Sequence, residues 1–359
     1  MKSLKNLKSL RSLKKVGAML AILALSVTCL AGCGGGNKPA DKAAAGGKDK
    51  EISLTLSVPD PETSSIGKSA AEYAKRVQDA SKGSLKVKVY YNGSLYGGDS
   101  AAGIKQLSAG GLDILILSSS LYASFNPGFN VISVPYMFDD TKQFTDYLNS
   151  ETGTKLMASV DKVNIKTLGT WTRSFRQVTN SKKPINVPQD LTGIKLRVPN
   201  NPLWVEYFAK TGASCTPMSF SEVYNALQLD TLDGQENPVD VPLSAKFYEV
   251  QKYISMTNHM ADAWLVGMNK AKFAALSDAQ KKVLTDAATD MQKWKVDYDK
   301  TADQKALDEL KSKGMTVNEI SKENHAKFVE LSKSLYGTFK GLVKDDALFD
   351  ATTKFVHKS

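Results

Sequence analysis

The sequence predicts an α/β protein in which strands of a mostly parallel sheet alternate with helices, and its 359 residues are enough for two domains. Three observations support this prediction. They are a strand–helix alternation over residues 52–118, a second such unit that begins at residue 194, and a long helical pattern over residues 277–314. A hydrophobic content of 42% is ordinary for a globular chain that builds a core.

The first 32 residues differ from the rest of the chain. Six Lys and Arg residues precede the apolar run "VGAMLAILALSVTCL" at residues 16–30, which is too short for a membrane span but suits the core of a signal peptide. The run ends in "LAGC", which resembles the lipobox of bacterial lipoproteins. We therefore predict a signal peptide at residues 1–32 and lipidation of Cys33. The alternative is an ordinary cleavable signal with an incidental cysteine.

Removal of this segment changes the charge argument. The whole chain has a net charge of +10. Because the segment contains six cationic residues and no Asp or Glu, the mature chain is left at about +4, which gives little reason to expect nucleic-acid binding. Cys215 is then the one cysteine left besides Cys33, so no disulfide within the folded body is expected. Residues 33–50, with the small and polar run "GGGNKPADKAAAGGKDK", are typical of a flexible tether.

The chain after the tether alternates strands and helices. Strand patterns at "ISLTLSV" (52–58), "LKVKVYY" (85–91) and "LDILILS" (112–118) are separated by helical patterns at residues 62–81 and 101–109. This order is typical of βαβ units, whose strands form a parallel sheet covered by helices.

The second unit begins with the strand pattern "IKLRV" at residues 194–198. Asn201 can cap the next helix and Gly212 can end it, while Ser219 and Glu222 have the spacing of a capping box for another helix. Farther on, residues 277–314 keep a helical period over an unusual length. That pattern fits either one or two surface helices or a single helix that crosses between two domains.

Few motifs for catalysis or metal binding occur. The three histidines lie far apart in the sequence and no CxxC accompanies them, so no metal site is expected. Neither a Walker A sequence nor GxGxxG is present, so we expect no nucleotide cofactor. A remote alternative is a serine penicillin-binding type of enzyme, with "SIGK" at 65–68, "SFN" at 124–126 and "KTG" at 210–212. Its third motif should lie on a strand edge, whereas here it ends a helix.

Arginines near strand ends are the more promising site residues. Arg197 lies in an apolar strand pattern, and Arg173 and Arg176 precede a proline-marked turn. Ligands of open parallel sheets bind beyond the carboxyl ends of the strands, and a guanidinium matches a carboxylate with two hydrogen bonds. A salt bridge to a local acid is the alternative for each arginine. Asn237 is either a turn residue before proline or an amide donor, and Phe220 is either core or a pocket wall.

A longer run then shows a family resemblance. Residues 196–238, "LRVPNNPLWVEYFAKTGASCTPMSFSEVYNALQLDTLDGQENP", resemble the solute-binding proteins of tripartite ATP-independent periplasmic (TRAP) transporters. The resemblance continues through "FYEVQKYISMTNH", "FRQVTN" and "VISVPYMF". It implies a periplasmic-binding-protein-like fold, with two α/β domains that close about hinge strands and a long helix that spans both. Domain I would comprise residues 51–173 and about 263–302, and domain II residues 174–262 and about 303–359.

The resemblance also implies a site and partners. Arg197 corresponds to the main carboxylate anchor of the family, Arg176 to a second arginine of sialic-acid binders, and Asn237 and Phe220 to lining residues. The implied function is reception of a carboxylate-bearing organic acid, without catalysis, cofactor or metal. The implied partners are the small and large TRAP membrane subunits. A receptor that reports the acid to a signalling protein is an alternative that needs the same cleft.

One segment departs from the sialic-acid binders. Where they have a Glu and an Arg, this chain has Ser118 and Leu121, so sialic acid is not the expected ligand. A smaller acid, such as a hexuronate, an aldonate or a C4-dicarboxylate, fits this change. We expect Ser118, Ser119 and Asp99 to meet ligand hydroxyl groups. The expected location is extracytoplasmic, with the lipid anchor in the membrane on the periplasmic side or at the cell surface.

Overall fold

The computed structural model of the protein describes residues 50–357. The predicted signal peptide, Cys33 and the tether up to residue 49 lie outside the described residues. Within the described part of the chain, no helix has the combination of length and apolar character needed to cross a membrane.

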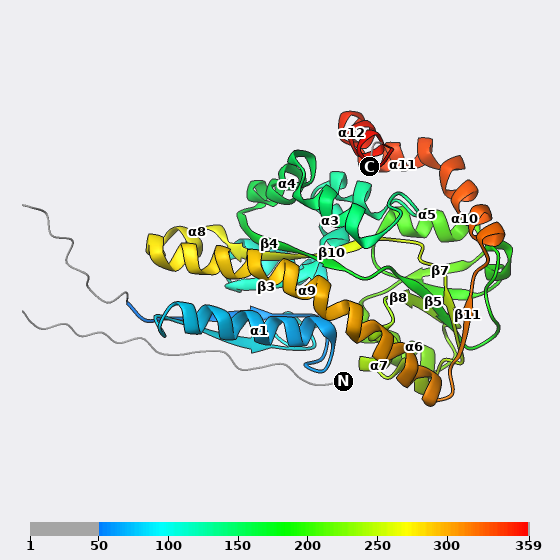
Figure 1. Cartoon of the computed structure of the whole chain (residues 1–359), viewed down its shortest axis with the longest axis horizontal. Coiled ribbons are helices and arrows are strands. Elements are labelled where there is room, and N and C mark those ends of the chain that lie inside the picture. Colours follow the sequence, from blue (N-terminus) through cyan, green and yellow to red (C-terminus); the bar gives the residue numbers. More distant parts are fainter. Residues whose placement is uncertain (1–49, 358–359) are drawn as a thin grey trace, which may run out of the picture. The chain divides into compact units, whose positions relative to one another are not determined.

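The described strands form two sheets (Figure 1). Sheet I has the order β2-β1-β3-β10-β4, and sheet II has the order β11-β9-β5-β8-β6-β7. The strands of sheet I are β1 Ile52–Ser57, β2 Leu85–Tyr90, β3 Ile114–Ser118, β4 Ile165–Arg173 and β10 Asp262–Asn269. Those of sheet II are β5 Gln177–Asn180, β6 Lys195–Val198, β7 Ser214–Pro217, β8 Gly234–Asn237, β9 Tyr253–Met256 and β11 Thr316–Glu319.

Both sheets are mixed, so the prediction of a mostly parallel sheet is only partly right. β1 pairs in parallel with β2 and β3, as the strand–helix alternation predicts. The antiparallel pairs all involve β10 or β5. These strands follow segments in which the chain leaves one sheet and enters the other, a connection that the local strand–helix pattern does not reveal.

Two short crossing segments connect the sheets, in addition to the helical connection from β10 to β11. Residues 174–176 lead from β4 of sheet I to β5 of sheet II, and residues 257–261 lead from β9 of sheet II to β10 of sheet I. The two segments are joined by backbone hydrogen bonds from Arg176 N to Met260 O (3.1 Å) and from His259 N to Arg176 O (3.2 Å). They are the hinge strands that the family resemblance implies.

Helices cover the sheets and fill the connections. The α-helices are α1 Ser65–Ala80, α2 Ser100–Ala109, α3 Thr141–Asn149, α4 Glu151–Ala158, α5 Pro202–Lys210, α6 Val223–Gln228, α7 Asp240–Ser244, α8 Lys270–Ala274, α9 Asp278–Ser312, α10 Lys322–Ser334, α11 Tyr336–Val343 and α12 Asp346–Val356. Short 3-10 helices are η1 Ser119–Ser124, η2 Pro127–Ser133, η3 Ser159–Val163, η4 Pro188–Leu191, η5 Phe220–Glu222 and η6 Phe247–Glu249.

Local capping signals are mostly confirmed. The side chain of Asn201 caps α5, and Gly212 follows that helix with φ +89, a conformation that favours glycine. Ser277 and Gln280 form a reciprocal capping box at the start of α9, which was not predicted. The capping box predicted at Ser219 is wrong. A 3-10 turn, η5, intervenes before α6, and the side chain of Ser219 makes no capping hydrogen bond because this turn carries it to the wall of a cavity.

The helical pattern near the C-terminus is one continuous helix, α9, of 35 residues (Figure 1). Ala288 and Met291, in its first half, belong to the buried cluster beneath sheet I. Farther along, Ala306 and Leu310 pack with Ile254 of β9 in sheet II. Of the two interpretations left open by the sequence, the single helix that spans both sheets is therefore confirmed.

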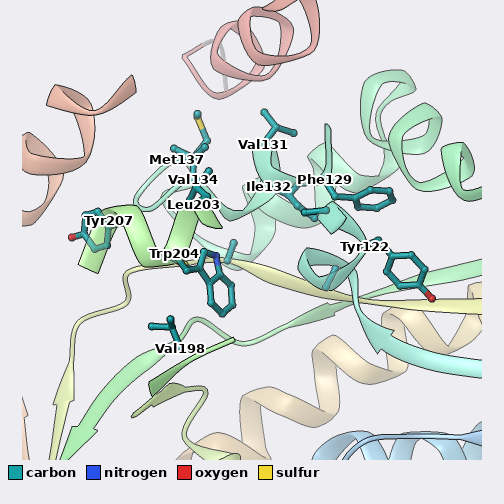
Figure 2. Packing of buried hydrophobic residues seen from close by; sticks show 14 of the residues in the cluster. Tyr122, Phe129, Val131, Ile132, Val134, Met137, Val198, Leu203, Trp204 and Tyr207 are labelled. Carbon is teal, nitrogen blue, oxygen red and sulfur yellow. The ribbon is translucent and has the colours of Figure 1, made fainter. Parts of the chain in front are cut away.

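A large apolar cluster fixes the end of β6. Figure 2 shows Leu203 and Trp204 of α5 among the buried side chains that include Val198 of β6 and Val131 and Met137. Trp204 and Val198 are completely buried. A close-packed core resists displacement of its side chains. This packing therefore holds the carboxyl end of β6, including Arg197, in one position.

Candidate functional site

A cavity, which we call the arginine cavity, lies where strands of both sheets end. Ser118 ends β3, Arg173 ends β4, Asn237 ends β8, and Arg197 lies one residue before the end of β6. Such a position agrees with the tendency of α/β proteins to bind ligands beyond the carboxyl ends of their strands. The lining residues are Pro59, Asp60, Ser100, Ala101, Leu117, Ser118, Leu121, Ser124, Arg173, Arg176, Arg197, Pro199, Asn200, Trp204, Met218, Ser219, Phe220, Asn237 and Trp264.

Arg176 is held by an internal ion pair. Its Nε lies 2.5 Å from Glu236 Oε2, and its Nη2 donates to Glu236 Oε1 (2.9 Å) and to Asn237 Oδ1 (2.8 Å). The guanidinium carbon lies 4.6 Å from the centre of the Trp204 ring. For Arg176 the salt-bridge alternative therefore applies, although the residue still lines the cavity.

His259 completes this buried pair. Its Nε2 lies 3.0 Å from Glu236 Oε2, and its Nδ1 lies 2.7 Å from the Thr257 hydroxyl. Burial lowers the pKa of His259, so the ring is neutral at pH 7 and can donate to Glu236 while it accepts from Thr257. Burial by itself raises the pKa of Glu236, but the charge of Arg176 and the hydrogen bonds from His259 and Arg176 outweigh it, and the pKa falls to about 2. Glu236 is thus ionised.

Arg173 is paired as well. Its Nη1 lies 3.2 Å from Asp262 Oδ2, and its Nη2 donates to Asn237 Oδ1 at 3.2 Å. The guanidinium carbon lies 4.3 Å from the centre of the Trp264 ring. Ser118, one of the predicted site residues, donates its hydroxyl to the same Asp262 oxygen at 2.7 Å. Ser118 therefore lines the cavity and also supports the ion pair.

Arg197 differs from the other two arginines. Its Nε and Nη2 donate to the carbonyl oxygen of Met218, at 3.0 and 2.6 Å. No carboxylate of the described residues lies within ion-pair distance of it, although only 4% of the residue is exposed. Burial lowers the pKa of Arg197 to about 9, which leaves the guanidinium charged at neutral pH. The cavity thus contains a buried cation that makes no ion pair with a carboxylate of the described residues.

The other predicted site residues divide into two groups. Asn237 and Phe220 line the cavity. The Asn237 amide donates to Gln235 Oε1 (2.6 Å) and its oxygen accepts from both arginines, so it orients Arg173 and Arg176. Phe220 also packs edge-to-face on Phe247, with ring centres 6.0 Å apart, so it is both core and cavity wall.

Asp99 and Ser119 are not among the lining residues. Asp99 accepts hydrogen bonds from Ala101 N (2.8 Å) and Ala102 N (3.1 Å), so its carboxylate caps α2, while the next residue, Ser100, reaches the cavity. Ser119 is fully buried in η1. The expectation that these two side chains meet ligand hydroxyl groups therefore finds no support in the geometry.

Several cavity residues were not predicted from the sequence. Asp60 follows β1 by three residues in "SVPDPE", and an acid shortly after a strand end is a signal that could have indicated it. Trp204 and Trp264 have the apolar character of core residues, but the ring of each also lies against the guanidinium group of an arginine. Glu236 does not line the cavity but binds Arg176, and it was not predicted because the turn signal of the proline in "DGQENP" dominates that segment.

The motifs of a serine enzyme do not gather at one place. Ser65 lies at the start of α1, where its hydroxyl donates to Asp299 Oδ1 at 2.5 Å. Lys210 is exposed at the end of α5 and pairs with Glu206. Of these three segments, only Ser124 reaches the arginine cavity. In the described residues, no three His, Cys, Asp or Glu side chains are grouped so as to hold a metal ion.

Comparison with known proteins decides the family. Residues 57–341 match the family described as bacterial extracellular solute-binding protein, family 7. The chain belongs to this family. The match spans both sheets, including the two crossing segments, and it confirms the resemblance to TRAP solute receptors.

Relatives of this family 7 member are similar over most of their length. The 2,3-diketo-L-gulonate-binding periplasmic protein YiaO of Escherichia coli K12 is 35% identical over 265 residues, 74% of this chain and 80% of YiaO. The sialic acid-binding periplasmic protein SiaP of Vibrio cholerae is 34% identical over 272 residues, 76% of this chain and 83% of SiaP. The crystal structure of the sugar acid binding protein DctPAm of Advenella mimigardefordensis, in complex with galactonate, aligns with a TM-score of 0.83 and 32% identity. The alignment covers 86% of this chain and 99% of that protein, and it confirms the two-domain fold.

Proposed function

We propose that this family 7 member is the extracytoplasmic solute receptor of a TRAP transporter, and that it binds a carboxylate-bearing organic acid in the arginine cavity. The observation that supports this most directly is Arg197, a buried guanidinium without a carboxylate partner in the described residues. A ligand carboxylate supplies the missing counter-ion. The ligands of YiaO, SiaP and DctPAm, which are 2,3-diketo-L-gulonate, sialic acid and galactonate, are all organic acids, and this supports the same ligand class.

Binding needs no bond to be made or broken. The acid enters between the two sheets, and its carboxylate accepts hydrogen bonds from Arg197. Arg176 adds a hydrogen bond from the guanidinium nitrogen that does not donate to Glu236. Closure about the crossing segments excludes water, and the ion pair becomes stronger as the effective dielectric constant falls. The closed receptor then delivers the acid to the small and large membrane subunits. The family consists of receptors, and we propose no catalytic step for this chain.

A thermal unfolding series tests this function. The purified receptor is heated with galactonate, glucuronate, 2,3-diketogulonate, sialic acid, succinate, or the neutral alcohol galactitol. A ligand present at about 100 times its dissociation constant should add about 2.7 kcal/mol of stability and raise the melting temperature by several degrees. We expect at least one acid to have this effect and galactitol to have none. A melting temperature that no acid raises would contradict the proposal.

We also propose that Cys33 holds the receptor at the membrane through a lipid, after removal of residues 1–32. The support is the "LAGC" sequence behind an apolar signal core. In cells that express the full chain, Cys33→Ser is expected to move the receptor from the membrane fraction to the soluble extracytoplasmic fraction and to abolish labelling with a fatty-acid analogue. Cys215→Ser, which alters the cysteine of the folded body, is the matched control and should leave both unchanged. Unaltered labelling of Cys33→Ser contradicts the anchor.

A further inference from the structure

Asp60 is a buried carboxyl group that the ion pairs of the arginine cavity do not use. It follows β1 by three residues and lines the cavity, and only 4% of it is exposed. Its side chain makes no hydrogen bond or ion pair with any of residues 50–357, whereas its backbone carbonyl accepts from Asn92 N at 3.0 Å. Prolines on both sides, Pro59 and Pro61, restrict the backbone, so the main chain that carries the carboxyl group is ordered before a ligand arrives.

The other acids that meet the cavity arginines have their internal partners. Glu236 is bound by Arg176 and His259, and Asp262 is bound by Arg173 and Ser118. A buried carboxyl group without partners is unfavourable, because burial removes the water that would otherwise solvate it. Asp60 therefore has unused acceptor capacity on the surface that meets a ligand.

The surroundings of Asp60 limit which chemical group of a ligand can bind to it. Burial raises the pKa of Asp60 to about 6, against the opposing effect of Arg173, so the group is mainly ionised at neutral pH. The charged groups that act on it include Arg173, Asp240, Arg176 and Lys295, and Asp60 in turn raises the pKa of Arg197 through its charge. A ligand ammonium group would meet the repulsion of Arg173. A second ligand carboxylate would meet the repulsion of Asp60 itself, and neither of the two can donate a proton to the other.

We propose that Asp60 accepts hydrogen bonds from hydroxyl groups of the bound acid and thereby selects polyhydroxy monocarboxylates over dicarboxylates. This inference depends on the proposed function, because Arg197 must hold the carboxylate. Arg197 belongs to sheet II and Asp60 follows a strand of sheet I, so the cavity offers a cation and an anion from two different sheets. An acid whose carboxylate binds Arg197 presents its hydroxyl-bearing carbons to Asp60.

Matched pairs of sugar acids test the selection. Galactonate and galactarate, and likewise gluconate and glucarate, differ only in that the terminal CH2OH of the first is a carboxylate in the second. Their dissociation constants are measured by calorimetry for the wild-type receptor and for Asp60→Asn, with succinate as an unhydroxylated dicarboxylate. Since a hydrogen bond to a charged acceptor is worth about a tenfold change in affinity or more, we expect the wild type to prefer the monocarboxylate at least about tenfold.

Asp60→Asn should reduce that preference by changing the affinities for the monocarboxylate and for the dicarboxylate in opposite directions. The amide removes the negative charge at nearly constant shape, so the monocarboxylate should bind about tenfold more weakly and the dicarboxylate more tightly. Asp79→Asn is the matched control. It removes one carboxylate from an exposed position of α1, where Asp79 pairs with Lys75, and it should leave all dissociation constants unchanged.

The outcomes separate this inference from the proposed function. Equal binding of both members of a pair by the wild type overturns the inference, and this comparison does not depend on the folding of any variant. An unchanged preference in a folded Asp60→Asn receptor, or binding of succinate in place of every sugar monocarboxylate, overturns it as well and leaves the proposed function intact. A wild-type receptor that binds none of these acids overturns both.

Discussion

Arg197→Ala is expected to weaken binding of the organic acid at least about a hundredfold. A guanidinium and a carboxylate can form two charge-assisted hydrogen bonds, each worth about 1.5–3 kcal/mol, and each 1.4 kcal/mol corresponds to a factor of ten in affinity. Arg173 and Arg176 cannot replace Arg197, because Asp262 and Glu236 already occupy them. The unliganded receptor should lose little stability, since removal of an unpaired buried charge offsets the lost packing.

Calorimetric titration of the variant with the best-binding acid measures this effect. Arg197→Lys keeps the charge but not the planar fork, so it should bind with intermediate affinity. Arg76→Ala is the surface control, because Arg76 pairs with Glu72 within one turn of α1 and does not line the cavity. If Arg197→Ala retains wild-type affinity while it remains folded, the arginine is structural and the proposed binding mode is wrong.

Glu236→Ala is expected to lower the free energy of unfolding by about 3–5 kcal/mol. The substitution leaves Arg176, which is 2% exposed, as a buried cation without its main partner, and this is the costly way to break a buried ion pair. It also removes the acceptor of the His259 ring nitrogen. Urea unfolding at pH 7 measures the loss. A change below about 1 kcal/mol, the range typical of exposed pairs, would contradict the structural role assigned to Glu236.

An exposed ion pair serves as the control for this loss of stability, and the pH dependence of unfolding is a second test of the role of Glu236. Glu206→Ala breaks the exposed pair with Lys210 and should change stability by less than about 1 kcal/mol. Because the pKa of Glu236 is about 2 in the folded protein and higher when unfolded, its contribution is complete above about pH 4.5 and is lost as the pH falls toward 2. The wild type should therefore lose more stability over this interval than Glu236→Gln, which cannot take up that proton.

The sequence predicted much of the fold because its signals are local. The strand patterns at the start of the chain, the Asn201 cap and the glycine after α5 each depend on a few neighbouring residues, and all agree with the structure. The capping box at Ser219 failed because a 3-10 turn, in which Phe220 packs against the distant Phe247, precedes the start of α6. The mixed sheets were missed because a strand that changes sheets has the same local pattern as one that does not.

The sequence by itself determined the family, the α/β alternation and the arginines near the strand ends. Only the tertiary structure decided which of these arginines has a carboxylate partner among the described residues. The partners of Arg176 and Arg173 lie 60 and 89 residues away in the chain, and the crossing segments bring them together. Ion pairing depends on distances of a few ångströms between side chains, which no local pattern encodes. Arg197 remains unpaired because the fold places no described carboxylate beside it.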